Sequence, residues 1–130
     1  MNKVEAEISI GELVDKITIL KIKKINIKDK NKLSYVKNEL KVLLNLYRSN
    51  VKKTNVVKSL EIDLMSVNQK LWTVEDKLRI LESKKLFNKN FILLARSVYK
   101  LNDKRAKIKN KINMHTLSSI VEVKSYQKYS

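Results

Sequence analysis

Three stripes of polar residues in this sequence recur at the spacing of a helical face. The first stripe is Glu12, Asp15 and Lys16, the second is Asn68, Trp72, Glu75 and Arg79, and the third is Tyr99, Asn102, Arg105 and Lys109, flanked by Arg96 and Asp103. Residues three and four positions apart are neighbours on one side of a helix. Each stripe therefore predicts a polar helix face next to an apolar one.

The chemistry that these stripes could carry is the binding of a phosphorylated anion. If their helices converge, Arg, Lys, Tyr and Asn donors would surround a pocket, with Trp72 and Tyr99 as flat surfaces for a ring or base. The planar fork of an arginine can engage two phosphate oxygens at once. We expect a non-catalytic site for a nucleotide, a nucleotide-derived signal or a nucleotide sugar, lined by Glu12, Asp15, Lys16, Asn68, Trp72, Glu75, Arg79, Arg96, Tyr99, Asn102, Arg105 and Lys109.

A structural role is the alternative for the same residues. Glu75 could pair with Arg79 along the surface of one helix, which stabilises a helix only slightly. Arg105 falls within an apolar seam and Glu12 falls at a helix start, so these two could form a buried pair or a cap. The spacing alone leaves both interpretations open.

Catalysis and metal binding have weaker support. Glu75 and Asp76 are adjacent and diverge by about 100° on a helix. Glu12 and Asp15 share a face and could hold a hydrated magnesium ion, but nothing supplies further ligands. Without Cys, and with His115 as the single histidine, the chain has little to bind a transition metal, and one Gly excludes a glycine-rich phosphate loop. We expect no metal and no cofactor; a small helical enzyme acting on a phosphorylated substrate is the alternative.

The elements that must position these residues are predicted to be helices within a single domain, residues 1–130. One Gly and no Pro among 130 residues remove the usual signals of β-turns. Ser9 and Glu12 match a capping box, so a first helix should begin there and continue to Asn26. A second helix is expected at residues 31–47, and a polar loop at residues 49–55.

Two longer helices follow, each with an apolar seam of heptad type. The first seam is Leu60, Leu64, Val67, Leu71, Val74, Leu78 and Leu81, and the second is Phe91, Leu94, Val98, Leu101, Arg105, Ile108 and Ile112. We predict an all-α bundle of about four amphipathic helices, with a short extended C-terminal tail or strand that contains Ile120, Val121, Val123 and Tyr126.

Four separated segments are similar to a known family. They are GELVDKITILKIK (residues 11–23), NQKLWTVEDKLR (68–79), FILLARSVYKLNDKRAKIKNKIN (91–113) and VEVKSY (121–126), and together they resemble a small bacterial and phage family, domain of unknown function 6165. The resemblance implies a compact helical protein and no established activity. It also covers the polar stripes, which favours their being a site.

The charge of the chain raises the question of partners. A formal net charge of +16 attracts phosphorylated molecules and nucleic acids alike. Sequence-nonspecific binding of nucleic acid by the lysine-rich surface is therefore a second alternative, although no reading motif is visible. A heptad seam also suits a homo-oligomer, or an adaptor that joins a partner protein. With no signal peptide and no long apolar segment, we expect a cytoplasmic protein without a membrane partner.

Overall fold

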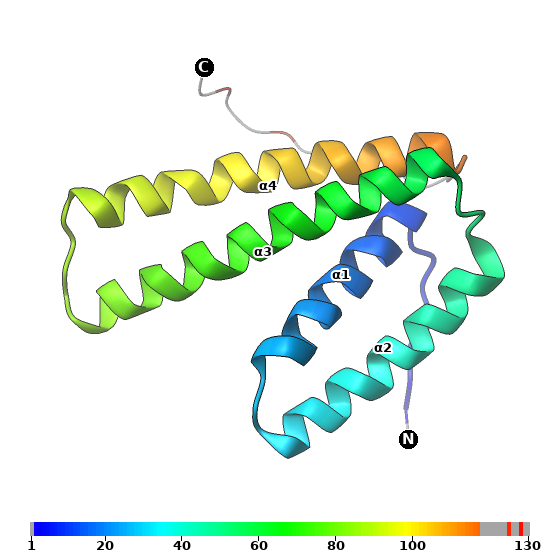
Figure 1. Cartoon of the computed structure of the whole chain (residues 1–130), viewed down its shortest axis with the longest axis horizontal. Helices are drawn as coiled ribbons and strands as arrows, with labels where there is room; N and C mark the ends of the chain where they lie inside the picture. Colours follow the sequence, from blue (N-terminus) through cyan, green and yellow to red (C-terminus); the bar gives the residue numbers. More distant parts are fainter. Residues whose placement is uncertain (1, 118–124, 126–127, 129–130) are drawn as a thin grey trace.

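The computed structural model describes residues 2–117, 125 and 128, and the described part of the chain forms four helices (Figure 1). They are α1 (Ile10–Asn26), α2 (Lys30–Asn50), α3 (Asn55–Ser83) and α4 (Lys89–His115). The prediction of an all-α fold with two long helices is thereby confirmed. The tail residues expected to be extended, Ile120, Val121, Val123 and Tyr126, lie outside the described residues.

The helix starts follow from side chains that can cap. Ser9, Asp29, Thr54 and Asn88 precede the four helices, and each accepts a hydrogen bond from the backbone N–H three residues on. This satisfies one of the backbone donors that a helix start leaves open. α2 continues to Asn50, beyond the predicted end, because Ser49 and Asn50 donate to the carbonyls of Asn45 and Leu46, four residues before them.

α1 is the central helix of the arrangement. α3 and α4 lie side by side as a long hairpin, and α1 packs against both of them and against α2 (Figure 1). α2 packs mainly on α1 and reaches α3 through the side chain of Tyr47. α1 lies against only the half of the hairpin that holds the start of α3 and the end of α4. The other half, residues 72–83 of α3 and 89–101 of α4, is called the distal half below.

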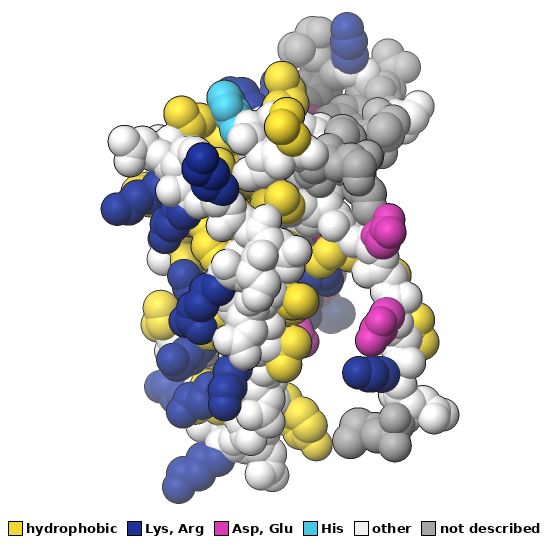
Figure 2. Space-filling view, turned by 90° about the vertical axis from the view of Figure 1, so that its right-hand side faces the viewer, with side chains coloured by type: hydrophobic (Ala, Val, Ile, Leu, Met, Phe, Trp, Pro, Cys, Tyr) yellow, Lys and Arg dark blue, Asp and Glu magenta, His cyan; other side chains and the backbone are white. Residues whose placement is uncertain are grey.

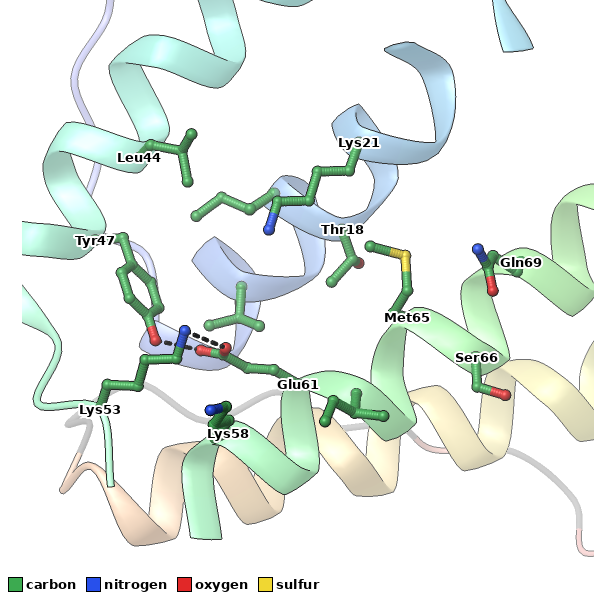
Figure 3. A pocket seen from close by; sticks show the side chains of 13 residues that line it. Thr18, Lys21, Leu44, Tyr47, Lys53, Lys58, Glu61, Met65, Ser66 and Gln69 are labelled. Atoms are coloured by element: carbon green, nitrogen blue, oxygen red, sulfur yellow. Dashed lines mark hydrogen bonds and ion pairs between the residues drawn. The ribbon is translucent and has the colours of Figure 1, made fainter. Parts of the chain in front are cut away.

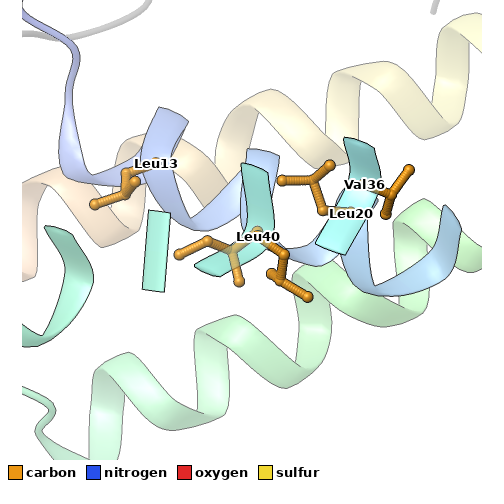
Figure 4. Packing of buried hydrophobic residues seen from close by; sticks show 5 residues of the cluster. Leu13, Leu20, Val36 and Leu40 are labelled. Atoms are coloured by element: carbon orange, nitrogen blue, oxygen red, sulfur yellow. The ribbon is translucent and has the colours of Figure 1, made fainter. Parts of the chain in front are cut away.

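Two apolar clusters hold α1 in place. Leu13, Ile17 and Leu20 face Val36 and Leu40 of α2 (Figure 4). On another side of α1, Val14 packs with Leu64 of α3 and Ile112 of α4, both of which are fully buried. A helix that buries residues on two sides needs neighbours on two sides, which is why α1 lies between α2 and the hairpin. Among the described residues, no helix is both long enough and apolar enough to cross a bilayer.

Gly11 permits α1 to approach α4 closely. A Cβ atom at this position would overlap the backbone oxygen of Lys109 and would lie 2.8 Å from Oδ1 of Asn113. The Gly11 N–H instead donates to that Asn113 oxygen at 2.7 Å. The one glycine of the chain therefore stands at the contact between the start of α1 and the end of α4.

Candidate functional site

Part of each polar stripe converges on one buried carboxylate, that of Asp15. Arg105 of α4 donates to both of its oxygens, at 2.8 and 2.5 Å, and Asn68 of α3 donates to one of them at 3.0 Å. Asn68 also donates to Thr18, at 2.7 Å. The Asp15 side chain is 1% exposed and that of Arg105 is 28% exposed. A planar guanidinium on a buried carboxylate is a geometry that holds helices together.

A second ion pair lies beside the first. Lys109 of α4 contacts the Glu12 carboxylate at 2.7 Å, and Lys16 lies 4.0 Å from the same carboxylate. Asn102 accepts a long hydrogen bond from Arg105, at 3.4 Å. Seven of the predicted site residues are therefore brought together where α1, α3 and α4 meet, and the cations Arg105 and Lys109 face carboxylates of α1.

The remaining five predicted site residues lie in the distal half of the hairpin. Glu75, Arg79 and Arg96 are exposed, Tyr99 is 41% exposed, and Trp72 is partly buried. Trp72 lines a hollow with Gln69 and Thr73 of α3 and with Ile22, Ile25 and Asn26 at the end of α1. The twelve residues thus fall into two groups at different places along the hairpin, seven where α1, α3 and α4 meet and five in the distal half. Their role in binding a ligand stays a prediction.

A larger cavity lies between α1, α2 and α3 (Figure 3). Here α2 and α3 diverge from the connection that joins them (Figure 1). The volume of the cavity is about 450 Å³, within the usual size of small-molecule sites. Its wall is mainly apolar, with polar groups at a few points; the lining residues are Val14, Ile17, Thr18, Lys21, Leu44, Tyr47, Lys53, Lys58, Glu61, Ile62, Met65, Ser66 and Gln69.

The one carboxylate that lines this cavity, Glu61, is already engaged. Tyr47 donates to it at 2.5 Å, and the ammonium of Lys53 lies 3.9 Å from its other oxygen and 5.9 Å from the centre of the Tyr47 ring. Burial, together with the hydrogen bond to the Glu61 carboxylate and its negative charge, raises the pKa of Tyr47 above its ordinary value. Tyr47 is therefore a neutral donor that fixes Glu61 at the edge of the cavity.

Two further lysines at the cavity lack such a partner. Lys21 comes from α1 and Lys58 from α3, and Figure 3 shows the Lys21 side chain extending across the cavity. Within the described part of the chain, neither ammonium lies within 4 Å of a carboxylate. Thr18, Ser66 and Gln69 add neutral hydrogen-bonding groups. The cavity thus has three lysines for one carboxylate, next to an apolar wall.

A groove between α1 and α2 adjoins this cavity, and Leu44 lines both. Its lining is Lys24, Lys37, Leu40, Lys41, Leu44 and Arg48. Figure 2 shows Lys and Arg side chains gathered along one side of the molecule, while the few acidic side chains in that view lie elsewhere. The cavity and the groove share Leu44, and six lysines and one arginine of α1, α2, α3 and the connection between α2 and α3 line the two.

Sequence reasoning missed the cavity and the groove although a signal was present. Lys37, Lys41, Leu44 and Arg48 recur at steps of four, three and four, and Lys58, Glu61, Met65 and Gln69 do so at steps of three, four and four. Both stripes have the spacing that marked the predicted site. What the spacing could not reveal is that α2 diverges from α3 and leaves an open space between them.

The fold and its cavity define a small all-helical protein with a basic, apolar-walled pocket. The chain belongs to the family of unknown function DUF6165, to which residues 3–129 match. The resemblance inferred from the sequence is thereby confirmed. No curated protein and no solved structure matches the chain.

Proposed function

We propose that this protein binds a phosphorylated small molecule in the cavity between α1, α2 and α3, in the cytoplasm and without transforming it. The observation that supports the proposal is the excess of cations there, where Lys21 and Lys58 have no carboxylate partner among the described residues. Lysines that share a cavity without a counterion repel one another, so an anion that enters would relieve a cost of folding. Lysine is a common ligand of phosphate, as a compact point charge.

The two kinds of lining predict how such a ligand would lie. Its ring or other apolar part would contact Leu44, Ile62 and Met65, because those side chains are only partly buried or exposed. Its phosphate would lie between Lys21 and Lys58. Glu61 would accept hydrogen bonds from a hydroxyl or amino group of the ligand, since its negative charge repels phosphate. A nucleotide or nucleotide sugar has all three features.

Calorimetric titration with nucleoside mono- and diphosphates, nucleotide sugars and inorganic phosphate tests the proposal. We expect at least one nucleotide to bind, and inorganic phosphate to bind far more weakly because it lacks the apolar contacts. Replacing Lys21 and Lys58 together with Ala should raise the dissociation constant about tenfold or more, which corresponds to about 1.4 kcal/mol.

The matched control is Lys111→Ala, which removes an exposed lysine of α4 and so changes the net charge without touching the cavity. Its affinity should equal that of the wild-type protein. Silence across the whole panel, or an equal loss in the control, would remove the proposal. A second variant, Met65→Trp, fills the cavity and should abolish nucleotide binding while leaving the weak binding of inorganic phosphate unchanged.

A second candidate function, sequence-nonspecific nucleic-acid binding, is favoured by the groove beside the cavity. Four cations line it, Lys24, Lys37, Lys41 and Arg48, from two helices. A row of cations can follow a phosphate backbone without reading bases. This function would use an extended polyanion, whereas the cavity would take one small molecule.

Fluorescence polarisation with single-stranded oligonucleotides of two unrelated sequences tests this candidate. We expect equal affinity for both sequences and a steep loss as salt is raised. The logarithm of the binding constant should fall linearly with the logarithm of the salt concentration. Replacing Lys37 and Lys41 with Ala should reduce the steepness of that line by about one unit for each phosphate that is no longer neutralised. Binding that survives moderate salt, or that prefers one sequence, would contradict this mode.

A further inference from the structure

The groove in which α1 lies continues past the end of α1, along the distal half of the hairpin. On α4 the residues that meet α1 are Asn113, which bonds Gly11, Lys109, which pairs with Glu12, and the buried Ala106. The same alternating steps of four and three lead on to the positions 102, 99, 95 and 92. Ile92 and Ala95 therefore lie on the continuation of the surface that α1 covers elsewhere.

Burial along the two heptad seams shows that this continuation lacks a cover among the described residues. Leu64 and Ile112, in the half that α1 covers, are fully buried, whereas the seam residues of the distal half are only partly buried; they are Val74, Leu78, Leu81, Phe91, Leu94, Val98 and Leu101. Ile92 and the two apolar residues of the turn, Leu86 and Phe87, are between 45 and 55% exposed. Two helices alone cannot bury their shared seam, so a further layer of helix would complete this core.

The pattern of charges along the open groove suggests that a second copy of the chain supplies the helices that would cover it. Glu75 and Arg79 are one helical turn apart on α3, on the side that Asn68 presents to α1. If a second hairpin lay across the groove in the opposite direction about a two-fold axis near residue 77, Glu75 of each copy would face Arg79 of the other. Because Glu75 and Glu82 share this face with Arg79, the face has charges of both signs, which suits a second copy of the same face.

The same axis fits the apolar residues. Because α3 ends at Ser83 and α4 begins at Lys89, residues 77 and 95 are equally far from the turn. Ala95 of the two copies would then meet at the axis, where a small side chain permits close approach, and Ile92 would face Val98 of the other copy. The exposed turn, with Leu86 and Phe87, would reach the hollow beside Trp72 in the other copy.

We propose that two copies of this chain associate through the distal halves of their α3–α4 hairpins, antiparallel, as a four-helix bundle. α1 requires the antiparallel direction, because it fills the other half of each groove and would block a parallel hairpin. The two copies repel through their net charge, so added salt should strengthen this dimer by screening, the opposite of its effect on nucleic-acid binding.

Analytical ultracentrifugation of the full chain tests the dimer. We expect a concentration-dependent dimer, with the emission of Trp72, the one tryptophan, shifting in parallel. Ile92→Glu should raise the dimer dissociation constant at least tenfold. Leu93→Glu is the matched control: Leu93 has the same exposure, 54%, but turns away from the groove by about 100° and should leave the dimer intact.

A charge exchange and a cross-link test the geometry itself. Glu75→Arg should weaken the dimer about tenfold, and adding Arg79→Glu should restore it to within about threefold, because reciprocal pairs form again. The chain has no Cys, so Ala95→Cys should give a covalent dimer on mild oxidation, while Leu93→Cys should not.

Three outcomes would overturn the proposal. The first is a monomer at every concentration tested. The second is a dimer in which Ala95→Cys fails to cross-link, which would place the interface elsewhere. The third is a monomer in which the thiol of Ala95→Cys resists labelling, which would assign the groove to another segment of the same chain.

Discussion

The two sides of α1 treat basic residues in opposite ways. On the side of α4, Arg105 and Lys109 each face a carboxylate of α1, and Asp15 is 1% exposed. On the side of α2 and α3, Lys21 and Lys58 line an open cavity without a carboxylate within 4 Å, in the part of the chain that the structure describes. The same net positive charge thus includes cations that join helices and cations that remain available to a ligand.

A basic residue in a sequence therefore indicates an anion-binding site only if no carboxylate of the same protein already pairs with it. Arg105, within the seam of α4, was predicted to bind phosphate. In the structure its guanidinium donates instead to both carboxylate oxygens of the buried Asp15 of α1. Asp15 is costly to bury without a partner, so Arg105 is needed for folding. Lys21 and Lys58, which line the cavity, pair with no carboxylate in the described part of the chain, so they could bind an anionic ligand.

The largest test of this comparison is Asp15→Ala. It would remove the carboxylate that faces Arg105 and one of the two acceptors of Asn68, and we expect the free energy of unfolding to fall by about 3 kcal/mol, measured by urea denaturation. Asp63→Ala, which removes an exposed carboxylate of α3, is the control and should change it by less than about 0.5 kcal/mol. The double variant with Asp15→Leu and Arg105→Leu should regain part of the lost free energy of unfolding, because no charge is left unpaired. If Asp15→Ala and Asp63→Ala had equal effects, the Asp15–Arg105 pair would not stabilise the fold.

A smaller effect is expected from Gly11→Ala. At an exposed helix position this change would stabilise by about 1 kcal/mol. Here the new methyl group would overlap the Lys109 backbone and force α1 away from α4, so we expect a loss of about 1–3 kcal/mol in the same denaturation experiment. Ser34→Ala, on an exposed face of α2, should be neutral or slightly stabilising. A stabilised Gly11→Ala protein would show that the close approach of the two helices is unnecessary.

The smallest effect concerns the cavity side and depends on pH. Burial and the hydrogen bond to Glu61 raise the pKa of Tyr47 above its ordinary value of 10.0, so the unfolded chain loses this proton at lower pH than the folded chain. The stability from this group is full below about pH 10 and falls at higher pH. Between pH 9 and about 11 the wild-type protein should lose up to about 1 kcal/mol more than Tyr47→Phe does, because the phenol is partly hydrated. Parallel pH curves for the two proteins would contradict the role of Glu61.

Helix positions could be predicted well from local patterns, and the places where those predictions were off have local causes too. The start of α1 at Ile10 follows from Ser9, whose hydroxyl accepts from the N–H of Glu12. α2 is longer than predicted, because Ser49 and Asn50 bond back to their own helix. The second half of the expected capping box, a contact of the Glu12 carboxylate with the start of its own helix, is replaced by an ion pair between Glu12 and Lys109 of α4.

The candidate site was predictable only in part. Spacing put Asp15, Asn68 and Arg105 each on a polar helix face, but it left open whether those faces meet. It could not say that they would satisfy one another, since hydrogen-bond partners 53 and 90 residues apart depend on how helices are packed. Nor could it separate them from Glu75 and Arg79, which share a face with Asn68 but lie beyond the end of α1.

The four helices, their caps and the apolar seams can be read from the amino-acid sequence, because they depend on residues within a few positions of one another. Helix packing, in contrast, sets which cations are neutralised, where the cavity opens and which half of the hairpin lacks a cover among the described residues. Those outcomes depend on the length and direction of α1, which reaches one half of the hairpin and ends before the other.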